Sequence, residues 1–404
     1  MKKTVIWLSG ILCMSLAAQP IFAVTVGDSI ELGAAVSITG KYSTNGKHTQ
    51  NGYDLAVKII NDKGGVKLGG KSYKIKIKYY DDESTPARGA QLAERLIKQD
   101  GIKFILGPYS SGLTKAMVSV TEKYKVPMVE ANGASVGLFN KGYRYLFAIL
   151  STTEQYLQTA VALAAKVNGK NTVKVAGVFE NDPFSQDIRN GVFADAKRLG
   201  MHVVIDDKLP PDLSDMSATL TKVKALKPNL LVVSGHAKGA ALAVRQVADM
   251  KVNVPMLAMT HCDSAEIIVK FAKAAEYILC ASQWDRSLSY RDALFGSAED
   301  FAQLFEKTYG YAPPYQAAES AAAVLVYKNA FERAGKLDTE MVRNAIAATD
   351  MQTFYGKVRF DKTGKNIAKP MILYQVQDGQ FKVVAPPQWA SATLRWPTPV
   401  WDKR

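Results

Sequence analysis

Short apolar runs alternate with longer amphipathic runs along most of this chain, and the alternation limits the folds it can adopt. In the first third, the runs that predict strands are residues 30–36, 73–80, 104–107 and 127–131. The runs with apolar residues at helical spacing, which predict helices, are residues 51–61, 87–99 and 114–124. Strands that alternate with helices in this way build a parallel sheet with helices on both faces.

The same rhythm starts again near residue 153 and predicts a second doubly wound unit. Its expected strands are residues 173–179, 203–206, 230–234, 255–259 and 277–281. Its expected helices are one from residue 153 and those at 185–199, 217–226, 240–250 and 265–274. The predicted fold class is therefore α/β, with two doubly wound parallel-sheet lobes.

After residue 282 the pattern changes to three expected helices and a strand-like tail. The helices are residues 298–308, 316–334 and 339–348. Asp378 and Gly379 form a predicted hairpin turn between strands at 371–377 and 381–384. If the late helices cover the first sheet and the tail joins the second, the chain crosses between lobes more than once. Such a hinge gives a cleft that opens and closes.

The first 23 residues read as a secretory signal peptide. Lys2 and Lys3 precede a largely apolar stretch at 4–18, and Ala23 is a small residue at the expected cleavage point. We therefore expect an exported protein. Cleavage would remove two of the lysines and reduce the formal net charge from +14 to +12.

The positive charge is spread along the chain, and no Arg-rich block stands apart. We therefore expect no nucleic-acid partner. Cys262 and Cys280 are the two cysteines beyond the leader, and the sequence leaves open whether they pair or whether Cys280 is simply a buried apolar residue. With no Cys/His cluster at ligand spacing, we expect neither a metal nor a cofactor.

The sequence also favours a binding protein over an enzyme. It has no HExxH string and no GxGxxG string that opens a helix after a strand. Its four histidines, at positions 48, 202, 236 and 261, fall in separate segments. A secreted α/β enzyme remains the alternative from another functional class.

Polar residues follow the predicted strands of the first lobe. Tyr109, Ser110 and Ser111 come after the strand at 104–107, and Asn132 and Ser135 come after the next strand. Ligands of open α/β sheets bind outside the carboxyl ends of the strands. Serine hydroxyls and free N–H groups at a helix start suit an anionic group. A helix N-cap and a plain turn are the alternative interpretations.

Acidic residues and a histidine follow strands of the second lobe. Glu180, His236 and Asp263 each lie at a predicted strand end. Together with the serines, they form the arrangement expected for a zwitterion, although each acid alone fits a solvated loop charge. The aromatic residues Phe184 and Trp284, with Tyr109, are candidate cleft-lining residues or core residues.

Several of these segments also carry a family resemblance. The segments AAVSITGKYSTNGKHTQNGYDLAVKIINDKGGV, YYDDESTPARGAQLAERLI, ILGPYSSG, VPMVEANGAS, FENDPFSQD and YGKVRFDKTGKN resemble the substrate-binding proteins of branched-chain amino-acid-type ABC transporters. The resemblance implies a type I periplasmic-binding fold with three crossovers. It implies a first lobe of residues 24–149 and 284–368 and a second of residues 150–283 and 369–404. It also implies a periplasmic location, a small-molecule ligand and an inner-membrane ABC permease as partner.

The resemblance assigns roles to particular residues. It implies that Ser111 and Ser135 hold a ligand carboxylate, that the residue at position 236 contributes from the second lobe, and that Asp263 takes the ligand ammonium. His236 stands where the family has an aromatic residue, and Asn45 stands where amino-acid binders often have one. These differences leave two ligand classes open. The first is an amino acid, and the second is an aromatic acid or amide.

Overall fold

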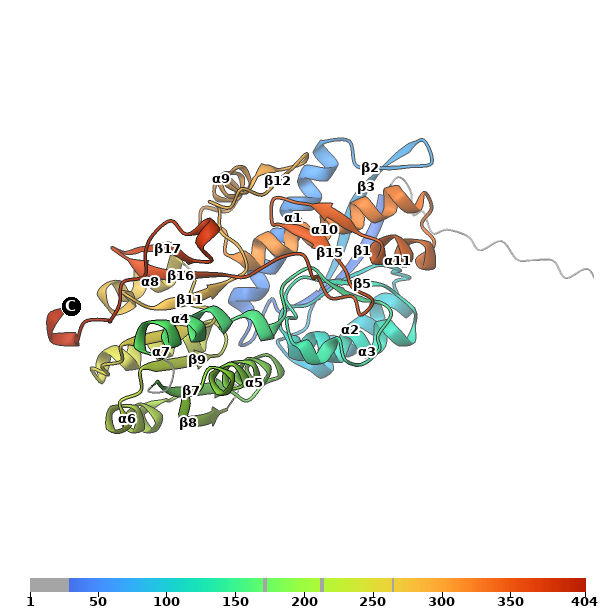
Figure 1. Ribbon diagram of the computed structural model, residues 1–404. Helices are drawn as coiled ribbons and strands as arrows, with labels where there is room; N and C mark the ends of the chain where they lie inside the picture. The colour runs from blue at the N-terminus through green and yellow to red at the C-terminus, as the bar shows by residue number, and fades with distance from the viewer. Residues whose placement is uncertain (1–28, 170–172, 211–213, 264) are drawn as a thin grey trace, which may run out of the picture.

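Two parallel-dominated sheets, each covered by helices on both faces, make up the body of the protein (Figure 1). The computed structural model describes residues 29–169, 173–210, 214–263 and 265–404, so the predicted leader lies outside the described residues. We call the six-stranded sheet with its helices the first lobe, and the seven-stranded sheet with its helices the second lobe.

The first sheet has the strand order β2-β3-β1-β4-β5-β6. Its strands are β1 (Ser29–Val36), β2 (Val66–Leu68), β3 (Lys71–Asp81), β4 (Ile105–Leu106), β5 (Met128–Glu130) and β6 (Leu146–Ala148). Neighbouring strands run parallel except β2 and β3, which pair antiparallel. Most of the central strands are buried on both faces, which explains their nearly continuous apolar sequences.

The second sheet has the order β17-β16-β11-β10-β9-β7-β8. Its strands are β7 (Lys174–Glu180), β8 (His202–Leu209), β9 (Leu230–Ser234), β10 (Met256–Met259), β11 (Leu279–Ser282), β16 (Ile372–Gln377) and β17 (Gln380–Ala385). The last two strands form an antiparallel hairpin on the edge of an otherwise parallel sheet. Asp378 and Gly379 turn this hairpin with positive φ angles of 54° and 68°, so the predicted turn is confirmed.

Helices cover both faces of the two sheets. Those of the first lobe are α1 (Ser43–Asp62), α2 (Pro86–Lys98), α3 (Ser111–Lys123), α9 (Ala298–Tyr309), α10 (Tyr315–Ala334) and α11 (Thr339–Ala347). Those of the second lobe are α4 (Gln158–Asn168), α5 (Pro183–Arg198), α6 (Ser217–Leu226), α7 (Ala237–Asp249) and α8 (Ala265–Phe271). Short hairpins add β12 (Arg291–Asp292) with β13 (Gly296–Ser297) and β14 (Asp350–Gln352) with β15 (Lys357–Arg359).

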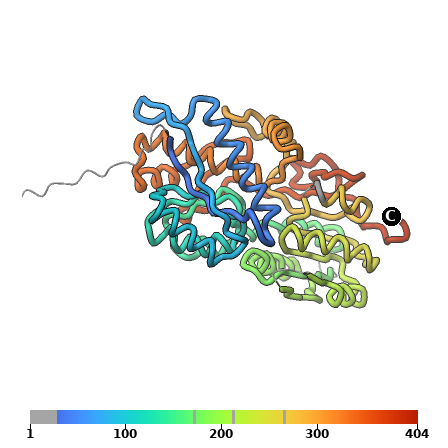
Figure 2. Tube along the Cα trace, turned by 180° about the vertical axis from the view of Figure 1, so that it is seen from behind, coloured from blue at the N-terminus to red at the C-terminus, as the bar shows by residue number. Residues whose placement is uncertain are grey.

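The late helix α10 packs along α1 on one face of the first sheet. The two helices lie side by side in Figure 2, which views the molecule from behind. A Cβ on Gly52 of α1 would lie 2.2 Å from the carbonyl oxygen of Ala317, so this close approach requires glycine. The Tyr327 hydroxyl lies 2.8 Å from Ile105 O and 2.7 Å from Pro127 O beside the sheet. The expected covering of the first sheet by late helices is therefore confirmed.

The chain passes between the sheets three times, and the three passing segments are hydrogen-bonded together. Ser151 N donates to Gln283 Oε1 at 3.1 Å, and Gln283 Nε2 donates back to Ser151 O at 2.9 Å. Ser151 Oγ donates to Lys369 O at 2.7 Å, and Lys369 Nζ donates to Gln283 O. We propose that the lobes divide at these segments, as the family resemblance implies.

The first helix begins eight residues earlier than its sequence pattern indicates. Residues 43–50 carry polar side chains and Gly46, so no apolar stripe marks them as helical. Packing accounts for the difference, because a Cβ on Gly46 would lie 2.0 Å from the carbonyl oxygen of Ser37. Asn45 therefore lies in the first turn of α1 rather than in a loop. The sequence patterns also missed β2 and β6, which have three residues each.

Cys262 and Cys280 form a disulfide, with Cα atoms 5.7 Å apart. It joins the loop after β10 to β11 and so ties down the segment that carries His261 and Asp263. Burial of Cys280 and disulfide formation, which the sequence offered as alternatives, therefore both hold. Among the described residues, none of the helices has both the length and the apolar character needed to cross a membrane.

Candidate functional site

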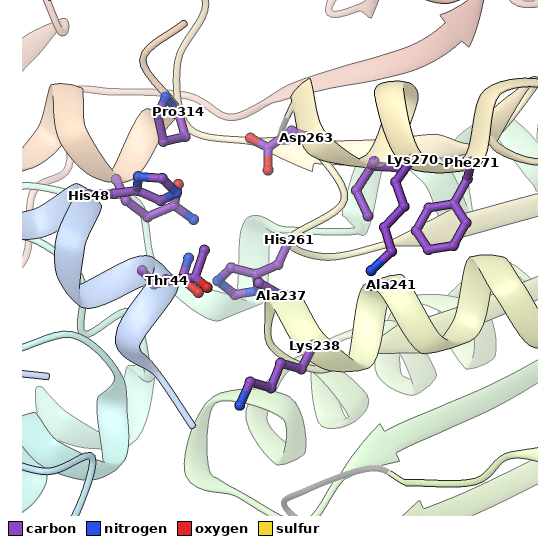
Figure 3. A pocket seen from close by; sticks show the side chains of 13 residues that line it. Thr44, His48, Ala237, Lys238, Ala241, His261, Asp263, Lys270, Phe271 and Pro314 are labelled. Carbon is purple, nitrogen blue, oxygen red and sulfur yellow. The ribbon is translucent and has the colours of Figure 1, made fainter. Parts of the chain in front are cut away.

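The carboxyl ends of the strands in the two sheets meet in a cleft, and two cavities lie along it. The smaller, of about 200 Å³, is lined by residues of both lobes. Thr44 and His48 reach it from α1, whereas Lys238, His261 and Asp263 reach it from the second lobe (Figure 3). A ligand here would contact both lobes, which is the condition for ligand-driven closure.

The larger cavity, of about 820 Å³, continues from the first and shares Thr44, His48, Asp263 and Pro314 with it. Five aromatic side chains lie on its wall: Trp284, Tyr311, Tyr315, Tyr374 and Phe381. The volume lies within the range of small-molecule pockets. The cleft therefore combines a small polar compartment with a large aromatic one.

Tyr109 joins the lobes through its hydroxyl. The oxygen lies 2.8 Å from His236 Nδ1 and 3.0 Å from His261 Nε2. His261 Nδ1 lies 2.8 Å from Gly235 O, which only accepts, so this nitrogen carries the proton. Burial lowers the pKa of His261 to about 3, so His261 is neutral and Nε2 accepts from Tyr109. The Tyr109 oxygen then accepts from His236 Nδ1–H.

The three predicted serines lie close together, but their hydroxyls bond to protein groups. Ser110 is the N-cap of α3, with φ 85°, and its Oγ accepts from Leu113 N at 3.4 Å. Ser111 Oγ accepts from Ser135 N at 2.9 Å. The Ser135 hydroxyl donates to Asp187 of the second lobe. None of the three serines lines either cavity. The helix-cap interpretation thus holds for Ser110, and carboxylate binding by the other two stays a prediction.

Two strings match the spacing of catalytic or nucleotide-binding motifs, but their structures do not match. Residues 133–137, GASVG, have the GxSxG spacing of a hydrolase elbow, yet the hydroxyl of the central serine donates to a carboxylate. Residues 65–72, GVKLGGKS, have P-loop spacing, but they form the β2–β3 hairpin instead of a strand, loop and helix. Spacing alone therefore indicates neither chemistry here.

Glu130, at the end of β5, fills the turn that the sequence offered as a ligand loop. Its Oε1 accepts from Asn132 N at 2.6 Å and from Gly133 N at 2.8 Å, and Oε2 lies 3.0 Å from Thr114 Oγ1. Complete burial raises the pKa of Glu130 to about 8. The Asn132 side chain is also engaged, since its Nδ2 donates to Ser320 Oγ. Two backbone donors of this turn are thus occupied by an internal carboxyl group.

A second buried carboxyl group, Glu180, ends β7 beside Asp182 and His236. Glu180 Oε1 accepts from His236 N at 3.2 Å, and Asp182 Oδ1 accepts from the N–H groups of Phe184 and Ser185 at the start of α5. Burial raises the pKa of Glu180 to about 7. Burial acts to lower the pKa of His236, but Asp182 and Glu180 together outweigh it and the net direction is upward.

The remaining predicted residues lie on the cavity walls. Asp263 lines both cavities and accepts from Ser282 Oγ at 2.7 Å, and burial raises its pKa to about 7. Asn45 lines the smaller cavity. Trp284 lines the larger one, with Nε1 donating to Phe354 O at 3.1 Å. The cleft-lining and core interpretations of Trp284 therefore both apply.

Sequence reasoning missed several residues of this cleft. Tyr42, in the loop before α1, packs edge-on against His236 with ring centroids 4.7 Å apart. His48 lines both cavities, and its Nδ1 lies 2.9 Å from the Tyr311 hydroxyl. The signal was present, because His48 follows Asn45 by three residues and so lies on the same face once α1 is extended.

Comparisons with known proteins cover most of the chain. A family model described as periplasmic binding protein matches residues 29–380. The Leu/Ile/Val-binding protein BraC3 of Rhizobium johnstonii is 26% identical over 376 residues, which are 93% of this chain and 98% of that relative.

Solved structures of similar fold include the isoleucine-bound branched-chain amino acid binding protein LivJ of Streptococcus pneumoniae. It has a TM-score of 0.78 and 24% identity, and the match covers 89% of this chain and 100% of that one. A benzoate-bound solute-binding protein of an ABC transporter from R. palustris has a TM-score of 0.76 and 20% identity, with coverage of 88% and 96%.

Proposed function

We propose that this chain, which belongs to the periplasmic binding protein family, is the exported receptor of an ABC importer. In this proposal it binds a small carboxylate-bearing solute between its lobes and delivers it to a membrane permease. The observation that carries the proposal is the pair of connected cavities whose walls come from both lobes. The family membership and the similar structures confirm the predicted fold and the prediction of a binding protein instead of an enzyme.

An amino acid is the first candidate ligand. Relatives that match along their full length are named for binding leucine, isoleucine and valine. Asp263 supplies an acid on the cavity wall for an ammonium group, and Lys238 and Lys270 lie on the same wall for a carboxylate. Their opposite charges suit a zwitterion. Export through cleavage near Ala23 belongs to the same proposal.

An aromatic acid is the second candidate. The larger cavity has an aromatic wall that exceeds the needs of a short aliphatic side chain. A solved protein of the same fold holds benzoate. Burial also raises the pKa of Asp263 to about 7, so its ionised form is disfavoured when no cation lies beside it.

Thermal-shift screening of the mature protein against amino acids, amides and aromatic acids tests the proposal. A ligand at 100 times its Kd adds about 2.7 kcal/mol to the free energy of unfolding. Asp263→Asn separates the candidates, since an amino acid should bind the variant much more weakly and an aromatic acid should bind as well or better. If no compound of these classes stabilises the protein, the proposed ligand chemistry is wrong.

Ser111→Ala tests the predicted carboxylate contact. If the hydroxyl meets a buried charge, affinity should fall by about 1–3 kcal/mol. The same hydroxyl also accepts from Ser135 N, so unfolding of the ligand-free variant must be measured as the control. Unchanged affinity would remove Ser111 from the binding site.

A further inference from the structure

Glu180, Asp182 and His236 lie together just after the ends of β7 and β9, and each has one buried atom without a hydrogen-bond partner. These atoms are Glu180 Oε2, Asp182 Oδ2 and His236 Nε2. Glu180 is 2% exposed and His236 5%, and the Asp182 side chain is 8% exposed. Buried polar atoms normally have a partner, and three orphans in one cluster indicate a missing common one.

The other half of each side chain is held in place by the fold. Glu180 Oε1 accepts from the His236 backbone N–H, and Asp182 Oδ1 accepts from two N–H groups of α5. The His236 Nδ1 proton goes to Tyr109, as the neighbouring histidine dictates. Each group is thus anchored through one atom and bare at the other. This is how metal-binding side chains are oriented by their outer contacts.

A proton on His236 Nε2 does not supply the missing partner. That nitrogen lies 3.7 Å from Asp182 Oδ1, which is longer than a hydrogen bond. One ligand atom from each of the three side chains lies within 4.8 Å of the others. A point at the centre of such a triangle is about 2.8 Å from each corner. Zinc bonds to nitrogen and oxygen are about 2.0–2.2 Å long, so shifts of about 0.6–0.8 Å would complete the bonds.

We propose that Glu180, Asp182 and His236 bind a divalent transition-metal ion in the cleft. Imidazole nitrogen with carboxylate oxygen favours zinc or a similar ion over magnesium or calcium, which prefer oxygen ligands only. Three protein ligands leave one position of a tetrahedral ion open. Tyr109 is a positioning residue of this site, because it orients the imidazole from the first lobe. The site adds to the proposed receptor function and does not depend on it.

Calorimetric titration of the chelator-treated protein with Zn²⁺, together with elemental analysis of the bound metal, tests the site. We expect one zinc per chain. His236→Ala and the nearly isosteric Glu180→Gln should each weaken binding at least 100-fold, since outer-contact changes alone cost about 10–100-fold. The loss of zinc affinity in Tyr109→Phe should fall within that smaller range of about 10–100-fold, and the variant should still bind one zinc.

His202→Ala is the matched control, because His202 is exposed and pairs with Lys174, at the opposite end of β7 from Glu180. It should bind zinc like the unaltered protein, and circular dichroism should show all variants folded. Bound Co²⁺ should give a visible absorption band that His236→Ala abolishes. The proposal is overturned if the unaltered protein binds no zinc, or if either ligand variant binds it as tightly as the control. The proposal is also overturned if organic amines, but not zinc, bind at these three residues.

Discussion

Glu130→Gln should make the stability of this protein less dependent on pH. Glu130 lies inside the first lobe, where a Cβ on the neighbouring Gly107 would be 2.0 Å from its Oε2, so no water fits on that side. Thr114 Oγ1 donates to Ser110 O at 2.8 Å, and a hydroxyl has a single proton. The same hydroxyl lies 3.0 Å from Glu130 Oε2, so it cannot fully serve both acceptors. The geometry therefore agrees with a raised pKa.

The size of the effect follows from the pKa of about 8 in the folded protein against the ordinary 4.5. Between these values the folded chain holds a proton that the unfolded chain releases. Stability is therefore lost as the pH rises from about 4.5 to about 8, by about 1.4 kcal/mol per pH unit. Glutamine has no such proton. The free energy of unfolding of Glu130→Gln, relative to the unaltered protein, should rise by about 2.7 kcal/mol between pH 5 and pH 7.

Urea unfolding of both proteins at pH 5 and pH 7 measures this change. The glutamine amide can also destabilise the fold by a fixed amount, for example through one unpaired N–H group. This free energy is the same at pH 5 and pH 7, so it cancels when the two pH values are compared. Glu299→Gln is the control, because hydrogen bonds from Arg286 lower the pKa of Glu299 and its effect should not change over this range. If the free energy of unfolding of Glu130→Gln, relative to the unaltered protein, is the same at pH 5 and pH 7, the folded protein carries an ionised carboxylate at this position.

Three further changes test the cleft and its supports. Tyr109→Phe removes the hydroxyl that joins both lobes and should destabilise the closed form by about 1–3 kcal/mol. Small-angle scattering should then show a larger radius of gyration. An unchanged radius would mean that this hydroxyl does not help to hold the lobes closed. Replacing Cys262 and Cys280 by serine should lower the free energy of unfolding by about 3 kcal/mol, and reduction of the unaltered protein should match it. Gly46→Ala places a Cβ 2.0 Å from Ser37 O and should cost about 1–3 kcal/mol in urea unfolding; equal stability would contradict the close packing of α1.

Many of the helices and strands could be predicted from the spacing of apolar residues, because these elements are long or buried. Strand β9 and helix α6 have the predicted bounds, since an apolar run and an amphipathic run each end at a polar or turn-forming segment. The start of α1 was not readable, because residues 43–50 are held in a helix by packing against the rest of the lobe. The three-residue strand β6 is too short to show a period.

The site was readable only in part, for a different reason. The sequence placed polar residues at strand ends correctly, but it could not show which of them bond to each other. Ser111 and Ser135 were expected to face a ligand, which stays a prediction, and the sequence could not show that the Ser111 hydroxyl accepts from Ser135 N. The turn at Asn132 and Gly133 was a candidate ligand loop, and its two N–H groups donate to the buried Glu130 side chain. Internal partners of this kind depend on tertiary contacts.

The expectation of no metal, which stays a prediction, meets the same limit. It rested on linear spacing, in which Glu180 and His236 are 56 residues apart and each histidine stands alone. Strands β7 and β9 are neighbours in the sheet and run parallel, so their carboxyl ends bring these two residues together, and β10 adds His261 beside them. Spacing rules suit ligands that share one helix or turn. In a doubly wound sheet, the informative search compares the residues that follow adjacent parallel strands, and strand order must be known before it can be made.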